Sequence, residues 1–159
     1  MAVQLAAQDM SDRVGAIVDR NIALEGPLLP ILHDVQGEFG FVPQAALRMI
    51  AERLNLSRAE VHGVMTFYHD FREEPAGRHV LKLCRAEACQ SMGGDRVAES
   101  AQVKLGIGWN EMTGDGSVTL EPIYCLGLCA CAPAAMLDGR VIGRLDEERL
   151  ERIIKQVRA

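Results

Sequence analysis

The sequence predicts an α+β fold, in which a helical bundle is followed by a mixed sheet packed against helices. Ahead of residues 73–77, a polar segment that contains Pro and Gly, apolar side chains recur at helical spacing. After that segment, short runs typical of strands alternate with helical segments. Of the 159 residues, 48% are hydrophobic and 25% are charged, which is ordinary for a globular protein. We therefore expect a helical bundle domain over residues 1–76 and a second domain over residues 77–159.

Four segments of the N-terminal half show helical periodicity. Residues 11–22 and 26–39 carry apolar side chains at near-helical spacing, and a Gly-Phe-Val-Pro turn at residues 40–43 ends the second run. The proline of this turn suits the first turn of a third helix. Ser57 and Glu60 form a capping-box sequence, which predicts a fourth helix. One side of that helix carries Val61, Val64, Met65 and Tyr68. Such an apolar stripe usually packs in a core, and a docking surface for a partner is the alternative.

The C-terminal half opens with a strand, a helix and a second strand. Residues 79–83 form a short β-like run. Residues 94–105 have helical periodicity, and Gly106 is a suitable C-cap. Turn residues at 113–116 then precede an alternating run at 118–122.

A hairpin and a final helix complete this half. Residues 134–137 and 140–143 flank Asp138-Gly139, which predicts a tight hairpin because both turn positions need positive φ. Asp146 is suited to cap a helix with an apolar stripe of Leu150, Ile153, Ile154 and Val157. The order strand, helix, three strands, helix resembles the thioredoxin-like fold that some ferredoxins use.

Charge and hydropathy exclude several classes of protein. The net charge is −5, and no cluster of Lys and Arg is suited to bind nucleic acid. The longest apolar runs are only a few residues, so we expect no insertion into a membrane. The first twenty residues carry several charges and no apolar core typical of a secretory signal. We therefore expect a cytoplasmic protein.

The five cysteines all lie in the C-terminal half, and four of them form two closely spaced pairs. Cys84 and Cys89 are separated by four residues, and Cys125 and Cys129 by three. Each pair follows a predicted strand, so two loops at one sheet edge would enclose a metal centre. Four thiolates are what a 2Fe–2S cluster requires, and disulfides are disfavoured in a reducing cytosol. Nearby glycines, namely Gly93, Gly94 and Gly127, would allow backbone N–H groups to approach the sulfurs.

Other readings of the cysteines remain open at this point. A structural zinc site in an interaction module also uses four thiolates, although its usual signature is a Cys-x2-Cys pair or a set with His. Dithiol redox chemistry requires a Cys-x-x-Cys motif, which the sequence lacks. Cys131 lies two residues after Cys129, and it is either a small buried side chain or a competing ligand.

Three motifs resemble a known family. The segment Cys125–Pro133 is similar to its C-L-G-x-C-x-x-A-P motif, and Val61–Tyr68 is similar to its V-x-G-V-x-T-F-Y motif. Gly40–Pro43 resembles its G-x-[LIV]-P turn. The family is the 24-kDa-type 2Fe–2S subunit of NADH dehydrogenase, a module that NAD-dependent hydrogenases and formate dehydrogenases share. The resemblance covers residues 26–158.

The resemblance implies a thioredoxin-like 2Fe–2S ferredoxin domain after the helical bundle. It implies one cluster on Cys84, Cys89, Cys125 and Cys129, and it favours Cys129 over Cys131. It also implies a role in electron transfer without catalysis on this chain, beside a partner subunit that binds FMN and NAD. The chain itself has no G-x-G-x-x-G fingerprint for NAD.

The segment around the first pair of cysteines indicates which member of the family the chain resembles. Residues 84–94 look closer to the gamma subunit of a soluble, molybdenum-dependent and NAD-dependent formate dehydrogenase. Respiratory members often have His directly after the second cysteine, where this chain has Gln90. The resemblance therefore implies formate dehydrogenase as the parent complex, with a catalytic molybdenum subunit among the partners. The equivalent subunits of respiratory NADH dehydrogenase and NAD-dependent hydrogenase are the alternatives.

Overall fold

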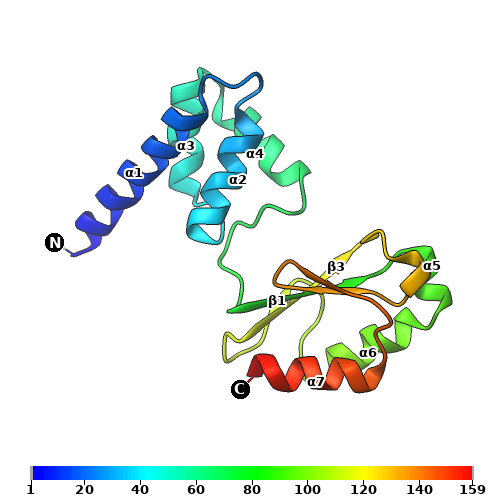
Figure 1. Ribbon diagram of the computed structural model, residues 1–159. Coiled ribbons are helices and arrows are strands. Elements are labelled where there is room, and N and C mark those ends of the chain that lie inside the picture. Colours follow the sequence, from blue (N-terminus) through cyan, green and yellow to red (C-terminus); the bar gives the residue numbers. More distant parts are fainter. Residues whose placement is uncertain (1, 159) are drawn as a thin grey trace. The chain divides into compact units, whose positions relative to one another are not determined.

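The computed structural model describes the backbone of residues 2–158 and the side chains from Asp9 to Arg158. The chain divides into two compact units, Met1–Pro75 and Ala76–Ala159. The first unit is helical, and the second contains a sheet with helices (Figure 1). Each unit has its own apolar core.

Four helices build the first unit: α1 (Ala2–Asn21), α2 (Leu28–Phe39), α3 (Gln44–Leu54) and α4 (Arg58–Phe67). Their buried apolar faces form one core, in which the largest fully buried side chains are Ile31, Leu32, Leu47, Ile50 and Met65. All four predicted helices are present. The first begins earlier than predicted, at Ala2 instead of residue 11, and its added residues include several Ala, the residue with the highest helix propensity.

The predicted capping box is present at the start of α4. The Glu60 N–H donates to the Ser57 hydroxyl at 3.2 Å, and the Ser57 N–H donates to the Glu60 carboxylate at 2.8 Å. Val61 and Met65 lie in the core, whereas Tyr68 is 44% exposed and the neighbouring Phe67 is 74% exposed. The core interpretation of this stripe is therefore confirmed for its first turns and fails at its C-terminal end.

The second unit contains a five-stranded sheet in the order β2-β3-β1-β4-β5. The strands are β1 (His79–Cys84), β2 (Glu111–Met112), β3 (Val118–Ile123), β4 (Ala135–Leu137) and β5 (Arg140–Ile142). β1 is parallel to β3, and all other neighbouring strands are antiparallel. The predicted hairpin turn is confirmed, because Asp138 and Gly139 have φ angles of 48° and 82°.

Two long helices, α6 (Gly94–Leu105) and α7 (Glu147–Arg158), lie along the same face of the sheet (Figure 1). Both predictions for these helices are confirmed, including Gly106 as the C-cap of α6. The core between sheet and helices contains Leu81 and Leu120 from the strands and Leu150 from α7. This unit has the predicted mixture of helices and a sheet.

Two short elements correct the predictions. The connection between Cys84 and Cys89 was expected to be a loop, but it contains the helix α5 (Glu87–Ser91), which carries Cys89. A five-residue helix is too short to show a periodic apolar pattern. The strand β2 was also not predicted, because its two residues are defined only by pairing with β3. None of the helices in the described residues is long and apolar enough to cross a lipid bilayer.

Candidate metal centre

The two pairs of cysteines meet because β1 and β3 are parallel neighbours. Cys84 is the last residue of β1, where it lies in register with Ile123 at the end of β3. Both strands therefore deliver the chain to the same edge of the sheet. Cys89 follows on α5, Cys125 lies just after β3, and Cys129 begins the short 3-10 helix η1 (Cys129–Cys131).

All four predicted ligands line one cavity of about 240 Å³. Its remaining wall is mostly apolar and comprises Ala86, Glu87, Ala88, Leu126, Leu128 and Ala134. The first pair is buried, with Cys84 5% and Cys89 2% exposed, whereas Cys125 and Cys129 are exposed. Cys131 lies outside this lining, although it follows Cys129 by only two residues.

The thiols are arranged as pairs. The sulfurs of Cys125 and Cys129 are 3.9 Å apart, and the thiols of Cys84 and Cys89 are hydrogen bonded to each other. Two sulfurs bound to one tetrahedral metal with bonds of about 2.3 Å lie roughly 3.8 Å apart. Among the described residues, no three His, Cys, Asp or Glu side chains are close enough to hold a single ion. Four thiols in two such pairs are the donor set of a core of two metals with two thiolates on each.

Backbone N–H groups point at the buried sulfur of Cys84. Burial alone would raise the pKa of this thiol, but hydrogen bonds from the Ala86 N–H, the Cys89 thiol and the N–H groups of Cys125 and Leu126 outweigh it. The net effect is a lowered pKa of Cys84. The loop after β3 therefore stabilises a thiolate at the end of β1.

The thiols of Cys89 and Cys129 have raised pKa values. Burial, and then the hydrogen bond with Cys84, raise the pKa of Cys89. The hydrogen bond and charge of Cys125 raise the pKa of Cys129. A bound metal would take the place of the protons on these thiols.

Glycines bring the backbone close to the four cysteines, and at Gly127 the predicted approach of an N–H group to a sulfur is present. The Gly127 N–H donates to the Cys125 sulfur at 3.4 Å, in a turn where both residues have positive φ. A Cβ at Gly94 would lie 2.6 Å from the carbonyl oxygen of Cys89. Gly93 has a φ of 88° and directs the chain from α5 into α6.

Sequence reasoning missed two contributors to the site. Ala134 is buried in the cavity wall, and its backbone N–H donates to the Cys89 sulfur. Gly143 contacts the second ligand loop, because a Cβ at this position would lie 2.8 Å from the Cβ of Cys131. Neither residue has a side chain that marks it as functional, so only the tertiary contacts identify them.

Curated proteins with similar sequences are components of redox complexes. One NADH-quinone oxidoreductase subunit of Mycobacterium tuberculosis is 35% identical over 151 residues, which cover 95% of this chain and 58% of the relative. Its counterpart from Pseudomonas aeruginosa is 36% identical over 121 residues, which cover 76% of this chain and 73% of the relative. NADP-reducing hydrogenase subunit HndA of Solidesulfovibrio fructosivorans is 30% identical over 132 residues, which cover 83% of this chain and 77% of the relative. The chain thus spans only 58% of the length of the mycobacterial relative.

A solved structure shares the fold. An NAD⁺-reducing [NiFe]-hydrogenase in the air-oxidized state superposes with a TM-score of 0.72 at 24% identity, over 82% of this chain and 22% of that chain. The family described as thioredoxin-like [2Fe-2S] ferredoxin matches residues 14–158, which is nearly the whole chain. With four paired thiols at the edge of its sheet, this chain belongs to the thioredoxin-like [2Fe-2S] ferredoxin family.

Proposed function

We propose that this chain is an electron-transfer subunit whose 2Fe–2S cluster is held by Cys84, Cys89, Cys125 and Cys129. The observation that carries the proposal is the convergence of these thiols, from two loops, on one cavity as two pairs. When bound, such a cluster takes up and releases one electron at a time.

The protein residues divide this work between a buried and an exposed side. Cys84 and Cys89 would hold the cluster from its buried side, and Cys125 and Cys129 would hold it from the side nearer the surface. The N–H groups directed at Cys84, Cys89 and Cys125 offset the negative charge of the core and its thiolates. The apolar wall excludes water from the buried side, so the exposed thiols of the second pair are the side open to a redox partner.

The partner in this proposal is a subunit that binds FMN and NAD. NADH delivers two electrons as a hydride, whereas the cluster accepts one, so a flavin has to stand between them. The sequence has no dinucleotide fingerprint of its own. The names of the relatives, which are subunits of quinone- and NADP-linked oxidoreductases, support a place in a multisubunit complex. A carrier that works alone would need little beyond the cluster unit, so the helical unit also favours a complex.

For the parent complex we propose a cytoplasmic NAD-dependent formate dehydrogenase with a molybdenum-containing catalytic subunit. The supporting residue is Gln90, which directly follows the second cysteine and donates from its side chain to the carbonyl of Arg85 at 2.6 Å. This contact bridges the first ligand segment. The names of the relatives favour the second candidate, the equivalent subunit of an NADH dehydrogenase or hydrogenase.

Purification of the native assembly tests both levels of the proposal. We expect two irons and two acid-labile sulfides on this chain, with an EPR signal that appears on reduction. FMN should be present on another chain of the assembly. Molybdenum in the assembly would support formate dehydrogenase as the parent complex. Nickel, or a membrane arm that reacts with quinone, would instead support the second candidate. One zinc and no sulfide on this chain would overturn the electron-transfer proposal itself.

A further inference from the structure

The loop that carries Cys129 is held by the segment that joins β5 to α7. The Arg144 N–H donates to the carbonyl of Cys131, and the Leu145 N–H donates to the carbonyl of Pro133 at 2.8 Å. These two bonds hold the ligand loop directly after Cys129. Arg144 has a φ of 51°, so its backbone adopts the left-handed conformation at this contact.

Side-chain packing reinforces the same contact. Gly143 lies so close to the ligand loop that a Cβ there would be 2.8 Å from the Cβ of Cys131 and 3.1 Å from its carbonyl oxygen. The side chain of Cys131 is thus occupied in packing on Gly143 and lies outside the cavity that the other four cysteines line.

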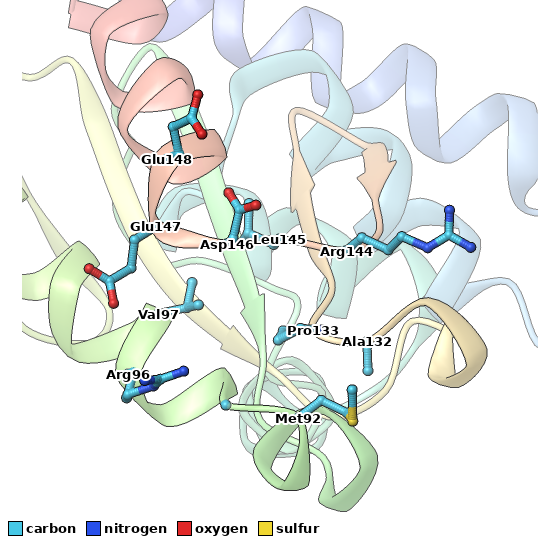
Figure 2. Close-up of a pocket in the computed structure, with 11 residues that line it drawn as sticks. Met92, Arg96, Val97, Ala132, Pro133, Arg144, Leu145, Asp146, Glu147 and Glu148 are labelled. Atoms are coloured by element: carbon cyan, nitrogen blue, oxygen red, sulfur yellow. The ribbon is translucent and has the colours of Figure 1, made fainter.

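The joining segment borders an open cavity on its side toward α6, although its Leu145 is buried in the core of this unit. A cavity of about 460 Å³ is bordered there by Pro133, Arg144 and Leu145, together with residues at the N-terminal ends of α6 and α7 (Figure 2). Leu145 therefore anchors one end of the segment, and hydrogen bonds to the backbone of Gly143 and Arg144 fix the part that borders the cavity.

Arg149, in the first turns of α7, supplies those bonds. Its Nη1 donates to the carbonyl of Gly143 at 2.7 Å and to the carbonyl of Arg144 at 3.0 Å. Its own backbone N–H donates to the Asp146 carboxylate at 2.8 Å, which caps the helix. The adjacent Leu150 is fully buried in the core, so α7 is a rigid support.

We infer that Arg149 is a positioning residue for the Cys129 ligand loop, and that Cys131 serves this loop by packing on Gly143. The inference rests on the proposed function, since it takes Cys129 as a ligand. Contacts run from the core-anchored α7 through the Arg149 guanidinium to the carbonyls of Gly143 and Arg144, and from there to Cys131. Partners of this kind, which orient the ligands of a metal, commonly change metal retention about 10- to 100-fold when they are removed.

The test compares Arg149→Gln with Arg152→Gln in the full chain. Arg152 is on the same helix, but its guanidinium pairs with Glu148 at the surface. We expect Arg149→Gln to bind the cluster, to alter its EPR spectrum after reduction, and to lose iron to a chelator roughly tenfold faster. Arg149→Lys should be intermediate, because an ammonium can still donate but lacks the planar geometry of the guanidinium. Arg152→Gln should match the wild-type chain in both measurements.

Two further variants separate positioning from general stability. Gly143→Ala inserts a Cβ against Cys131 and should reproduce the EPR change without touching α7. Leu150→Ala removes a buried side chain of α7 but leaves the Arg149 bonds, so it should lower the thermal midpoint and spare the EPR spectrum.

The outcomes distinguish this inference from the proposed function. Equal EPR spectra and equal rates of iron loss in Arg149→Gln and Arg152→Gln overturn the positioning role, as does an equal EPR change in Leu150→Ala. Arg149→Lys and Gly143→Ala decide the same question if Arg149→Gln does not fold. A wild-type chain that carries no iron and sulfide, or a Cys129→Ser variant that keeps the full cluster, overturns the proposed ligand set and this inference with it.

Discussion

Backbone N–H groups take the place of water at the sulfur of Cys84. Three of them, from Ala86, Cys125 and Leu126, donate to this buried thiol. A cluster with four thiolates carries net negative charge, which burial disfavours and directed N–H donors offset. Because these donors come from both ligand loops, a displacement of either loop changes the environment of the same sulfur.

Substitution of single cysteines tests the ligand set at the residue scale. Ser in place of Cys84, Cys89, Cys125 or Cys129 should abolish or strongly reduce the bound iron and sulfide, since each thiolate fills one of four coordination positions. Cys131→Ser is the matched control and should retain the cluster, because Cys131 lies outside the cavity and Ser keeps the Cβ that packs on Gly143. Iron analysis, acid-labile sulfide analysis and visible absorption measure the cluster content of the four ligand variants and of the control. A Cys131→Ser chain without a cluster, beside a Cys129→Ser chain with one, would reverse the assignment.

The close approach at Gly94 gives a second prediction at this scale. A Cβ there would lie 2.6 Å from the carbonyl oxygen and 2.9 Å from the carbonyl carbon of Cys89, and these backbone atoms cannot rotate away. Gly94→Ala should therefore lower the free energy of unfolding by about 1–3 kcal/mol, measured by urea denaturation. Gly37→Ala is the control. Its Cβ would meet nothing within 4 Å in the last turn of α2, so the variant should be neutral or up to about 1 kcal/mol more stable. Equal effects of the two variants would contradict this account of Gly94.

At the scale of elements, the turn between β2 and β3 makes the stability of the fold depend on pH through Asp115. In the turn between β2 and β3, the Thr113 hydroxyl, then the hydroxyl and N–H of Ser117, donate to the carboxylate of Asp115 and hold its pKa well below the usual range. These donors favour the charged form only in the folded state. Asp115 therefore contributes stability above the pKa of an unfolded Asp, and this contribution is lost as pH falls through the lowered pKa.

Asp115→Asn should accordingly lower the thermal midpoint at neutral pH. The difference in thermal midpoint between this variant and the wild-type chain should shrink as pH falls below about 4. Thermal unfolding followed by circular dichroism between neutral and acidic pH measures this. Glu74→Gln, which removes an exposed carboxylate from the segment between the units, controls for the loss of one negative charge. A difference for Asp115→Asn that stays constant across this pH range would show that the charged hydrogen bonds have no such role.

Local sequence signals predicted most elements because their determinants lie within a few residues. Gly106 ends α6, the Asp138-Gly139 pair turns the hairpin, and Asp146 caps α7 through the Arg149 N–H. The elements that were missed have other determinants. β2 exists only through its pairing with β3, and α5 is shorter than two turns of helix. Their formation depends on contacts that sequence periodicity does not report.

At the scale of the whole molecule, the chain has two separate cores. The first unit buries Ile31, Leu47 and their neighbours, whereas the second buries Leu81, Leu120 and the small cluster around Cys84 and Cys89. All the residues that line the cluster cavity belong to the second unit. The cluster fold thus has every contact it needs within that unit.

A fragment of residues 77–159 should therefore fold and bind the cluster without the helical unit. We expect the same EPR spectrum on reduction and the same iron and sulfide content per chain as the full chain. A fragment of residues 1–76 should be helical and free of iron, since it contains no cysteine. Circular dichroism and metal analysis of both fragments measure this. A C-terminal fragment that folds only when the helical unit is added back would contradict the proposed independence of the two domains.

The amino-acid sequence by itself determined the class of the fold, most of its elements and the four paired cysteines. These follow from periodicity, caps, turn residues and ligand spacing, all of which are local or countable. It left open whether Cys129 or Cys131 faces the centre, because the two lie on the same short segment.

Only the tertiary structure decided how these cysteines are used. It places Cys129 at the cavity and packs Cys131 on Gly143, which is distant in sequence. It also separates a buried pair from an exposed pair, and it directs N–H groups from one ligand loop to a sulfur of the other. The physical reason is that the parallel pairing of β1 with β3 sets which loops meet, and such long-range pairing is not encoded in the spacing of ligands along the chain.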